Sequence, residues 1–189
     1  MIKINSSVLV GGSRTLSAPA AAAAACSAFT RSLLKAGCVL SVGCATGADQ
    51  IALNTAVCSK SFSQVRAFAA FTPAGNGSFG GSAVKAMQAA ARAGVAVTWL
   101  AGGSLSVPLV ARLMARSLAA LRGCSAAVFF SPGVGSLKVA RAALRAGTPV
   151  LISCAGLSTA PALAIAPSST VVFGQPFWLF APAVQPALF

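Results

Sequence analysis

The fold of this chain can be predicted from one stretch, Phe130-Ser131-Pro132-Gly133-Val134-Gly135-Ser136. The stretch follows the apolar run Ala126-Ala127-Val128-Phe129-Phe130, which is typical of a buried strand. It precedes a segment with helical character, from Leu137 to Ala146, which ends at Gly147. A strand, a glycine-rich turn and a helix in this order point backbone N–H groups toward an anion at the start of the helix.

Two glycines and a serine in this turn suit a bound phosphate. Gly133 and Gly135 have no Cβ, so the backbone there can approach a ligand closely. Ser136 can cap the helix or donate a hydrogen bond to a phosphate oxygen. The same residues also suit an ordinary turn between a strand and a helix, so this stretch alone leaves both interpretations open.

The rest of the chain repeats the alternation of strand and helix. Apolar runs predict strands at residues 7–10, 38–42, 65–71, 95–100, 126–130 and 150–154. Helices are predicted to end at Lys35 and to cover residues 49–57, 82–92, 108–122 and 137–146. Ser17 and Pro19 suit the N-cap and the first turn of the first helix. Continuous apolar strands between helices predict an α/β fold, namely a doubly wound, mostly parallel, Rossmann-like sheet with helices on both faces.

Three glycine-rich turns are expected to meet at one edge of this sheet. Ligands of doubly wound sheets bind outside the carboxyl ends of the strands, where the strand order reverses. Gly11 to Arg14, Gly43 to Asp49 and Ser131 to Ser136 each follow a predicted strand. We therefore expect these turns to line one pocket.

The alternation breaks after Cys154. We expect residues 1–154 to form the Rossmann-like domain and residues 155–189 to form an irregular, apolar tail that packs on it. Within the tail, residues 170–173 suit an edge strand and residues 177–180 form an aromatic cluster. The aromatic cluster either packs against the domain or forms a dimer contact or a lid.

Basic residues greatly outnumber acidic ones. The 189 residues include 14 Lys and Arg and a single acid, Asp49, which gives a net charge of +13. Almost no basic side chain can therefore pair with a carboxylate of the same chain. Either a polyanion such as nucleic acid balances this charge, or the charge reflects a biased composition that counterions balance.

The residue types exclude several kinds of site. The chain has six cysteines, none in a C-x-x-C pair, and no histidine, so we expect no metal site and no cofactor besides the ligand. Without histidine there is no Ser-His-Asp or Cys-His catalysis, and a single Asp excludes paired carboxylates. We find no uncharged apolar run of 18 residues and no signal-peptide pattern, and free thiols suit a reducing compartment. We therefore expect a cytoplasmic protein that does not bind a membrane.

Four segments resemble motifs of the SLOG superfamily. This group of Rossmann-like domains includes the DprA proteins that process DNA, the LOG nucleotide phosphoribohydrolases and the YpsA-like proteins. Gly12-Ser13-Arg14 resembles the GSR motif, and residues 43–49 resemble a G-x-A-x-G-x-D turn. Arg112-Leu113-Met114-Ala115 resembles the Arg-bearing helix of YpsA-like members, and residues 131–136 resemble the PGGxGT phosphate-binding turn. The order and spacing match over residues 7–154.

The resemblance implies that residues 1–154 bind a nucleotide or a nucleotide-derived ligand, as in a SLOG-type sensor or processing domain. Arg14 would clamp a phosphate and Arg112 would be a second cation. Asp49 would accept a hydrogen bond from a ribose hydroxyl or brace its turn. The candidate ligand-binding residues are Gly11, Gly12, Ser13, Arg14, Gly43, Thr46, Gly47, Asp49, Arg112, Ser131, Pro132, Gly133, Gly135 and Ser136.

Two departures from the family pattern argue against hydrolase activity. LOG hydrolases carry a Glu three residues after the Thr of the phosphate-binding turn, and Val139 stands at that position here. One glycine of the PGG triplet is also missing. A valine cannot stabilise charge at a ribose, which leaves Asp49 as the sole candidate general base. Whether the chain is an enzyme therefore stays open.

Two alternatives to a nucleotide-binding domain remain. A DprA-like protein that binds single-stranded DNA would use Lys138, Arg141 and Arg145, which lie at helical spacing. A nucleotide phosphoribohydrolase would use Asp49. In both cases a homodimer is an alternative to a monomer, because domains of this group often pair.

Overall fold

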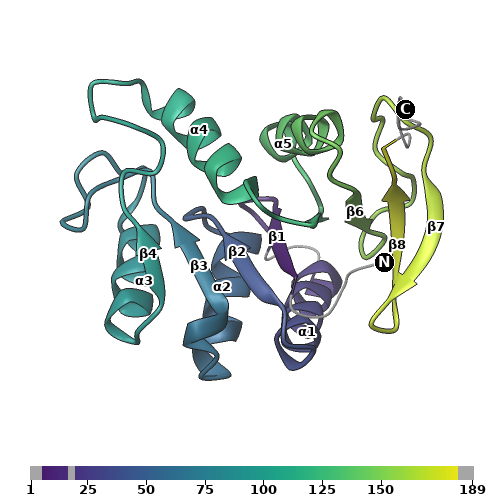
Figure 1. Cartoon of the computed structure of the whole chain (residues 1–189), viewed down its shortest axis with the longest axis horizontal. Helices are drawn as coiled ribbons and strands as arrows, with labels where there is room; N and C mark the ends of the chain where they lie inside the picture. The colour runs from purple at the N-terminus through teal and green to yellow at the C-terminus, as the bar shows by residue number, and fades with distance from the viewer. Residues whose placement is uncertain (1–5, 17–19, 183–189) are drawn as a thin grey trace, which may run out of the picture.

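Strands and helices alternate along the chain as the apolar runs predict. We describe a computed structural model, which covers residues 6–16 and 20–182 (Figure 1). The strands are β1 (Ser7–Gly12), β2 (Val39–Val42), β3 (Val65–Phe68), β4 (Ala96–Thr98), β5 (Ala126–Phe130), β6 (Val150–Ser153), β7 (Ser168–Val172) and β8 (Gln175–Phe180). The helices are α1 (Ala20–Lys35), α2 (Ala48–Cys58), the 3-10 turn η1 (Phe62–Gln64), α3 (Gly81–Arg92), α4 (Leu109–Leu121) and α5 (Val134–Arg145).

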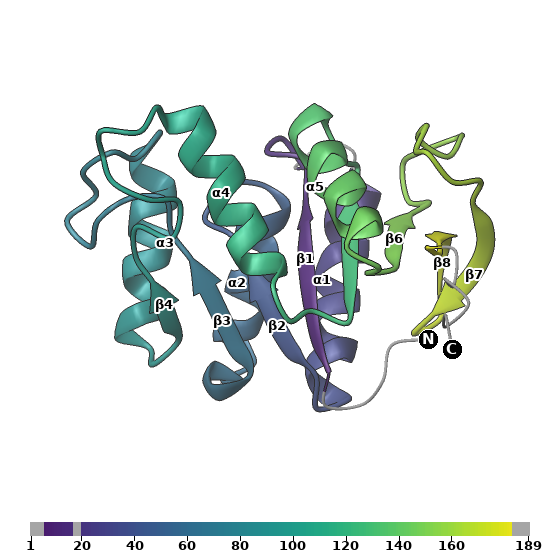
Figure 2. The same cartoon turned by 45° about the horizontal axis from the view of Figure 1, so that its top comes forward.

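The strands form one sheet in the order β4-β3-β2-β1-β5-β6-β8-β7. The six strands from β4 to β6 are parallel to one another, and β8 and β7 join antiparallel at one end. Helices α1, α2 and α3 cover one face, and α4 and α5 cover the other (Figures 1 and 2). The predicted doubly wound α/β fold is therefore confirmed.

The strand order reverses between β1 and β5. The chain moves outward from β1 through β2 and β3 to β4, then returns through α4 to β5 on the other side of β1. In the register of this pair, Gly12 lies beside Phe130, so the two strands end together. This is the point at which doubly wound sheets bind ligands.

The apolar runs of the central strands are explained by burial on both faces. All residues of β5 and of β6 are buried, as are the inner residues of β1. Rings of Phe29, Phe130 and Phe177 pack edge to face with centroids 5.4–6.0 Å apart. Burial of each such ring contributes about 1.5–3 kcal/mol, which holds α1 against β5 and β8 of the sheet.

The boundaries differ from the predicted ones in three places. β3 and β4 are shorter than the strands predicted at residues 65–71 and 95–100. β4 is an edge strand of three residues, and it pairs with only part of β3. Helix α5 begins at Val134 and not at Leu137, which makes the turn after β5 shorter. The edge strand predicted at residues 170–173 is present as β7, whereas the tail is not irregular at residues 175–180, where β8 forms a hairpin with β7 and pairs with β6. Ser17, Pro19 and residues 183–189 lie outside the described residues.

Candidate functional site

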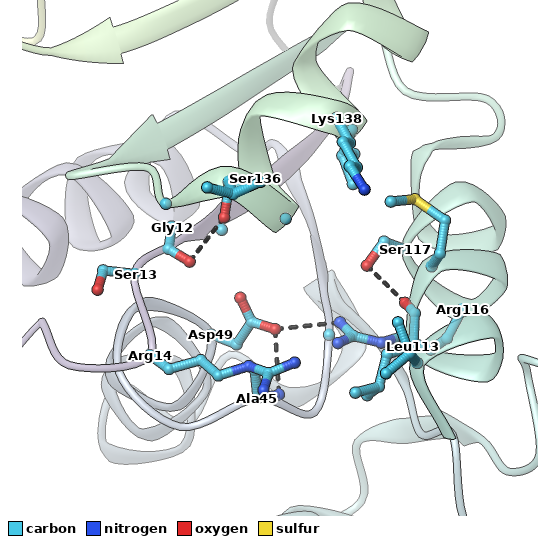
Figure 3. Close-up of a pocket in the computed structure, with 18 of the residues that line it drawn as sticks. Gly12, Ser13, Arg14, Ala45, Asp49, Leu113, Arg116, Ser117, Ser136 and Lys138 are labelled. Atoms are coloured by element: carbon cyan, nitrogen blue, oxygen red, sulfur yellow. Dashed lines mark hydrogen bonds and ion pairs between the residues drawn. The ribbon is translucent and has the colours of Figure 1, made fainter. Parts of the chain in front are cut away.

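A cavity of about 980 Å³ opens at the carboxyl ends of β1 and β5 (Figure 3). It lies on the face that carries α4 and α5, and both helices contribute side chains to its walls. Ten of the residues singled out in the sequence line it: Gly11, Gly12, Ser13, Arg14, Gly43, Asp49, Gly133, Gly135, Ser136 and Lys138. The predicted convergence of three turns is therefore present in the structure.

Hydrogen bonds join the three turns to one another. The Ser13 N–H donates to the Phe130 carbonyl at 3.1 Å, and the Ala48 N–H donates to the Ser13 carbonyl at 3.1 Å. The Thr46 hydroxyl donates to the Arg14 carbonyl at 3.2 Å. Ser136 does not cap α5, because the helix begins at Val134 with Gly133 as its N-cap. The Ser136 hydroxyl donates to the Gly12 carbonyl at 2.8 Å. These bonds hold the turns after β1, β2 and β5 in one rigid arrangement.

Close packing of the turns requires glycine at two positions. Gly47 has φ +74°, and a Cβ there would collide with the Ser13 carbonyl oxygen. A Cβ at Gly12 would collide with the Phe130 carbonyl oxygen. Gly47 therefore supports the turn that carries Ser13 and Arg14 without lining the cavity itself.

An ion pair between Asp49 and Arg116 lies at the base of the cavity. The Arg116 Nη1 is 3.1 Å from the Asp49 Oδ2, and both side chains are more than nine-tenths buried. The same carboxylate oxygen accepts a hydrogen bond from the Ala45 N–H at 3.1 Å (Figure 3). The Arg116 guanidinium packs against the backbone of Gly43. A Cβ on residue 43 would overlap Arg116 Nη1. The glycine at position 43 thus makes room for the ion pair.

Burial raises the pKa of Asp49 above its usual value of 3.8, because the carboxylate loses its hydration. The positive charge of Arg116 opposes this shift most strongly, followed by the Ala45 N–H and the charge of Arg14. These groups of the protein itself therefore stabilise the charged form of Asp49. Its position in the first turn of α2 also suits the helix dipole.

Arg14 is the exposed cation at the mouth of the cavity. Its guanidinium carbon lies 5.2 Å from the centroid of the Phe79 ring, a cation–π distance. In the described part of the chain, the sole carboxylate already pairs with Arg116. Arg14 is thus free to turn its donors toward a ligand anion.

The start of α5 forms the wall across from Arg14. Gly133, Val134 and Gly135 are exposed and line the cavity, and the first turn of the helix contains no acid. The backbone N–H groups of a helix's first turn have no partner within the helix, so this end carries positive potential. Lys138 is exposed one turn further along and also lines the cavity. Val139 is buried beneath it.

Arg112 lies away from the cavity, whereas Arg14, the other arginine predicted to bind the ligand, lines it. Its guanidinium is buried and donates to the carbonyls of Ala70, Gly77 and Val107. These bonds tie α4 to the loops that follow β3 and precede α4. Arg112 therefore supports loops, and it does not line the cavity.

The remaining predicted residues also lie outside the cavity lining. Ser131 and Pro132 shape the turn before α5, and Arg141 and Arg145 are exposed further along that helix. The Arg141 guanidinium donates to the Ala162 carbonyl at 3.1 Å.

Sequence reasoning missed Arg116 and Phe79 as residues of this site. Arg116 lines the cavity, and its Nε has no hydrogen-bond partner among the described residues. One signal could have identified it: a single buried acid needs a cation, and Arg116 lies on the apolar face of α4 beside Leu113. No sequence signal indicates that Phe79, in the loop before α3, would reach Arg14.

Residues 6–16 and 20–182 contain no group of three or more His, Cys, Asp or Glu side chains that could hold a metal ion. None of their helices is both long enough and apolar enough to cross a bilayer.

Comparison with known proteins supports the fold. No family model matches the chain, and no curated protein matches it in sequence. A solved structure of DNA processing protein A from Helicobacter pylori, studied for its single-stranded DNA binding mode, is similar with a TM-score of 0.65. The two chains are 19% identical, and the match covers 83% of this chain and 69% of the other. The chain thus shares its Rossmann-like fold with this DNA processing protein A.

Proposed function

We propose that this chain binds a nucleotide or a nucleotide-derived ligand in the cavity. The observation that carries the proposal is the meeting of three glycine-rich turns, an acid-free helix start and the exposed Arg14 around one cavity. A phosphate at the start of α5 would accept hydrogen bonds from backbone N–H groups and from Arg14. The candidate ligand-binding residues are those of the turns that line this cavity.

The walls of the cavity divide into a cationic part and an apolar part. Arg14 and Lys138 supply positive charge, and Arg116, whose charge is paired with Asp49, adds its unpartnered Nε as a buried donor. Leu113 and Phe129 belong to the apolar part, between α4 and the sheet. A ligand with a phosphate at one end and a flat, weakly polar base at the other fits this division.

The contacts of Asp49 and Val139 favour binding over hydrolysis. Val139 lines the cavity at the position where LOG hydrolases carry their Glu, so no carboxylate is available there. Asp49 already accepts hydrogen bonds from Arg116 and from the Ala45 N–H. A phosphoribohydrolase activity would have to use a carboxylate that the fold itself needs.

Single-stranded DNA is the second candidate ligand. The similarity of fold to a DprA protein favours it, as do the exposed cations Lys138, Arg141 and Arg145 along α5. A bound strand would extend past the cavity over this helix, whereas a mononucleotide would stay inside.

A binding titration at 50 mM and 500 mM NaCl tests both candidates. We expect at least one member of a panel of mononucleotides and nucleotide sugars to bind with little loss at high salt, because the cavity shields the phosphate contacts. Arg14→Ala should weaken this binding about tenfold or more, since it removes a charge-assisted contact. Arg31→Ala, which removes an exposed cation of α1, is the control.

A labelled oligo(dT) in the same titration tests whether single-stranded DNA is the ligand. Binding that is lost at high salt, survives Arg14→Ala and falls in Lys138→Ala/Arg141→Ala would replace the nucleotide proposal with the DprA-like one. A homodimer formed through the apolar C-terminal segment stays a prediction, which sedimentation equilibrium would check.

A further inference from the structure

Each of the five α-helices ends in one exposed basic residue. Lys35, Arg92 and Arg145 are the last residues of α1, α3 and α5. Arg122 is the C-cap of α4, and Lys60 lies two residues after the end of α2. All five side chains are exposed. We call this set the amino-edge cations.

The topology brings these five residues to one edge of the molecule. Each helix runs antiparallel to the strands and leads into the amino end of the next parallel strand, from β2 to β6. Figure 2 shows the turns from α1, α2 and α3 into their strands along the lower edge of the sheet. Neighbouring packed helices lie about 8–10 Å apart, so the cations of α1, α2 and α3 form a row. The cavity lies at the opposite edge, where the strands end.

Among residues 6–16 and 20–182, no carboxylate pairs with the amino-edge cations. The single acid of the chain is buried at the other edge and pairs with Arg116. Favourable interaction with the negative end of a helix dipole is by itself enough to explain a basic residue at a helix end. The helix dipole, however, does not explain a basic residue at a position whose backbone conformation disfavours any residue with a Cβ.

Lys60 is such a cation. The residue two positions past each helix adopts a positive φ, and in four of the five turns it is a glycine: Gly37, Gly94, Gly123 and Gly147. In the turn after α2 this residue is Lys60, with φ 53°. The Cβ of a lysine is strained in this conformation, and a glycine would avoid that strain. At this turn a cation replaces the residue that the fold prefers.

The surroundings of these cations favour a phosphate backbone over a membrane. The large apolar side chains that are exposed in the described residues are Leu105, Val110, Val134, Val171 and Phe173, and none lies in these five turns. A membrane-bound surface needs apolar anchors beside its cations, and base stacking needs exposed aromatic rings. We propose that the amino-edge cations form a second anion-binding surface, which binds the phosphate backbone of nucleic acid without reading its sequence.

The test compares two triple variants of equal net charge. Lys35→Gln/Lys60→Gln/Arg92→Gln removes the row on α1, α2 and α3, and Arg31→Gln/Arg66→Gln/Lys85→Gln removes three exposed cations outside this row. The probe is a labelled 20-base-pair DNA duplex, whose charge density is twice that of one strand. We expect the first variant to bind about tenfold or more weakly at 50 mM NaCl and to lower the slope of log K against log salt by about 3. Equal weakening in both variants would overturn the proposal, because net charge alone would then explain the binding.

Lys60→Gly separates the proposed role from helix stabilisation. The glycine relieves the left-handed backbone, so thermal stability should stay the same or rise while duplex binding falls by several-fold. Unchanged duplex binding would assign Lys60 no role in the proposed surface. Binding to vesicles with anionic lipid but not to the duplex would show a membrane surface and overturn the proposal.

This surface is independent of the ligand proposed for the cavity. Arg14→Ala and a saturating nucleotide should leave duplex binding within about twofold, because they act at the opposite edge. If Arg14→Ala and the saturating nucleotide each abolished duplex binding, the cavity would be the nucleic-acid site and the amino edge would have no such role. If no nucleotide binds while the duplex does, the cavity proposal alone fails.

Discussion

At the scale of single side chains, the charge of Asp49 depends on Arg116. Arg116→Met should cost about 3–5 kcal/mol of stability in urea unfolding, because it leaves a buried carboxylate without its cation. The folded state already binds the Asp49 proton more tightly than the unfolded chain, so stability falls as pH rises from 3.8 through the raised pKa. Arg116→Met raises this pKa further and should extend the loss to higher pH. Asp49→Asn/Arg116→Met should recover part of the loss, and a cost below about 1 kcal/mol for Arg116→Met would contradict the pairing.

At the scale of elements, the start of α5 combines two effects that a single change separates. Val134 is 75% exposed in an acid-free first turn, so Val134→Glu should stabilise the helix by about 0.3–1 kcal/mol. The same negative charge at the cavity wall should weaken binding of the best nucleotide of the panel about tenfold. Val134→Gln, which adds no charge, is the control for both thermal unfolding and binding. Stabilisation with unchanged binding would show that the ligand phosphate does not lie at this helix.

At the scale of the whole molecule, repulsion among 14 cations opposes folding. Screening lengths shrink from about 30 Å at 0.01 M salt to about 3 Å at 1 M, whereas the buried Asp49–Arg116 pair is little affected. We expect NaCl over this range to raise the free energy of unfolding by about 1 kcal/mol, or the melting temperature by about 2–4 °C. Differential scanning calorimetry measures this shift. A melting temperature that falls with salt would mean that surface ion attractions, and not repulsion, dominate.

The alternation of apolar runs with glycine-punctuated helices was enough to predict the doubly wound sheet, because burial on both faces requires continuously apolar strands such as β5. The same logic predicted that the turns after β1, β2 and β5 would meet, since parallel strands end at one edge. Only the tertiary structure decided which cation enters the cavity: Arg112 and Arg116 lie one helical turn apart on α4, yet one binds loop carbonyls and the other binds Asp49. It also decided that β8 pairs with β6 and carries β7 at the edge of the sheet, because the pairing of β8 depends on a neighbour that is distant in the chain. Local pattern determines elements and edges, whereas the partner of a buried charge or of an edge strand depends on contacts between residues far apart in sequence.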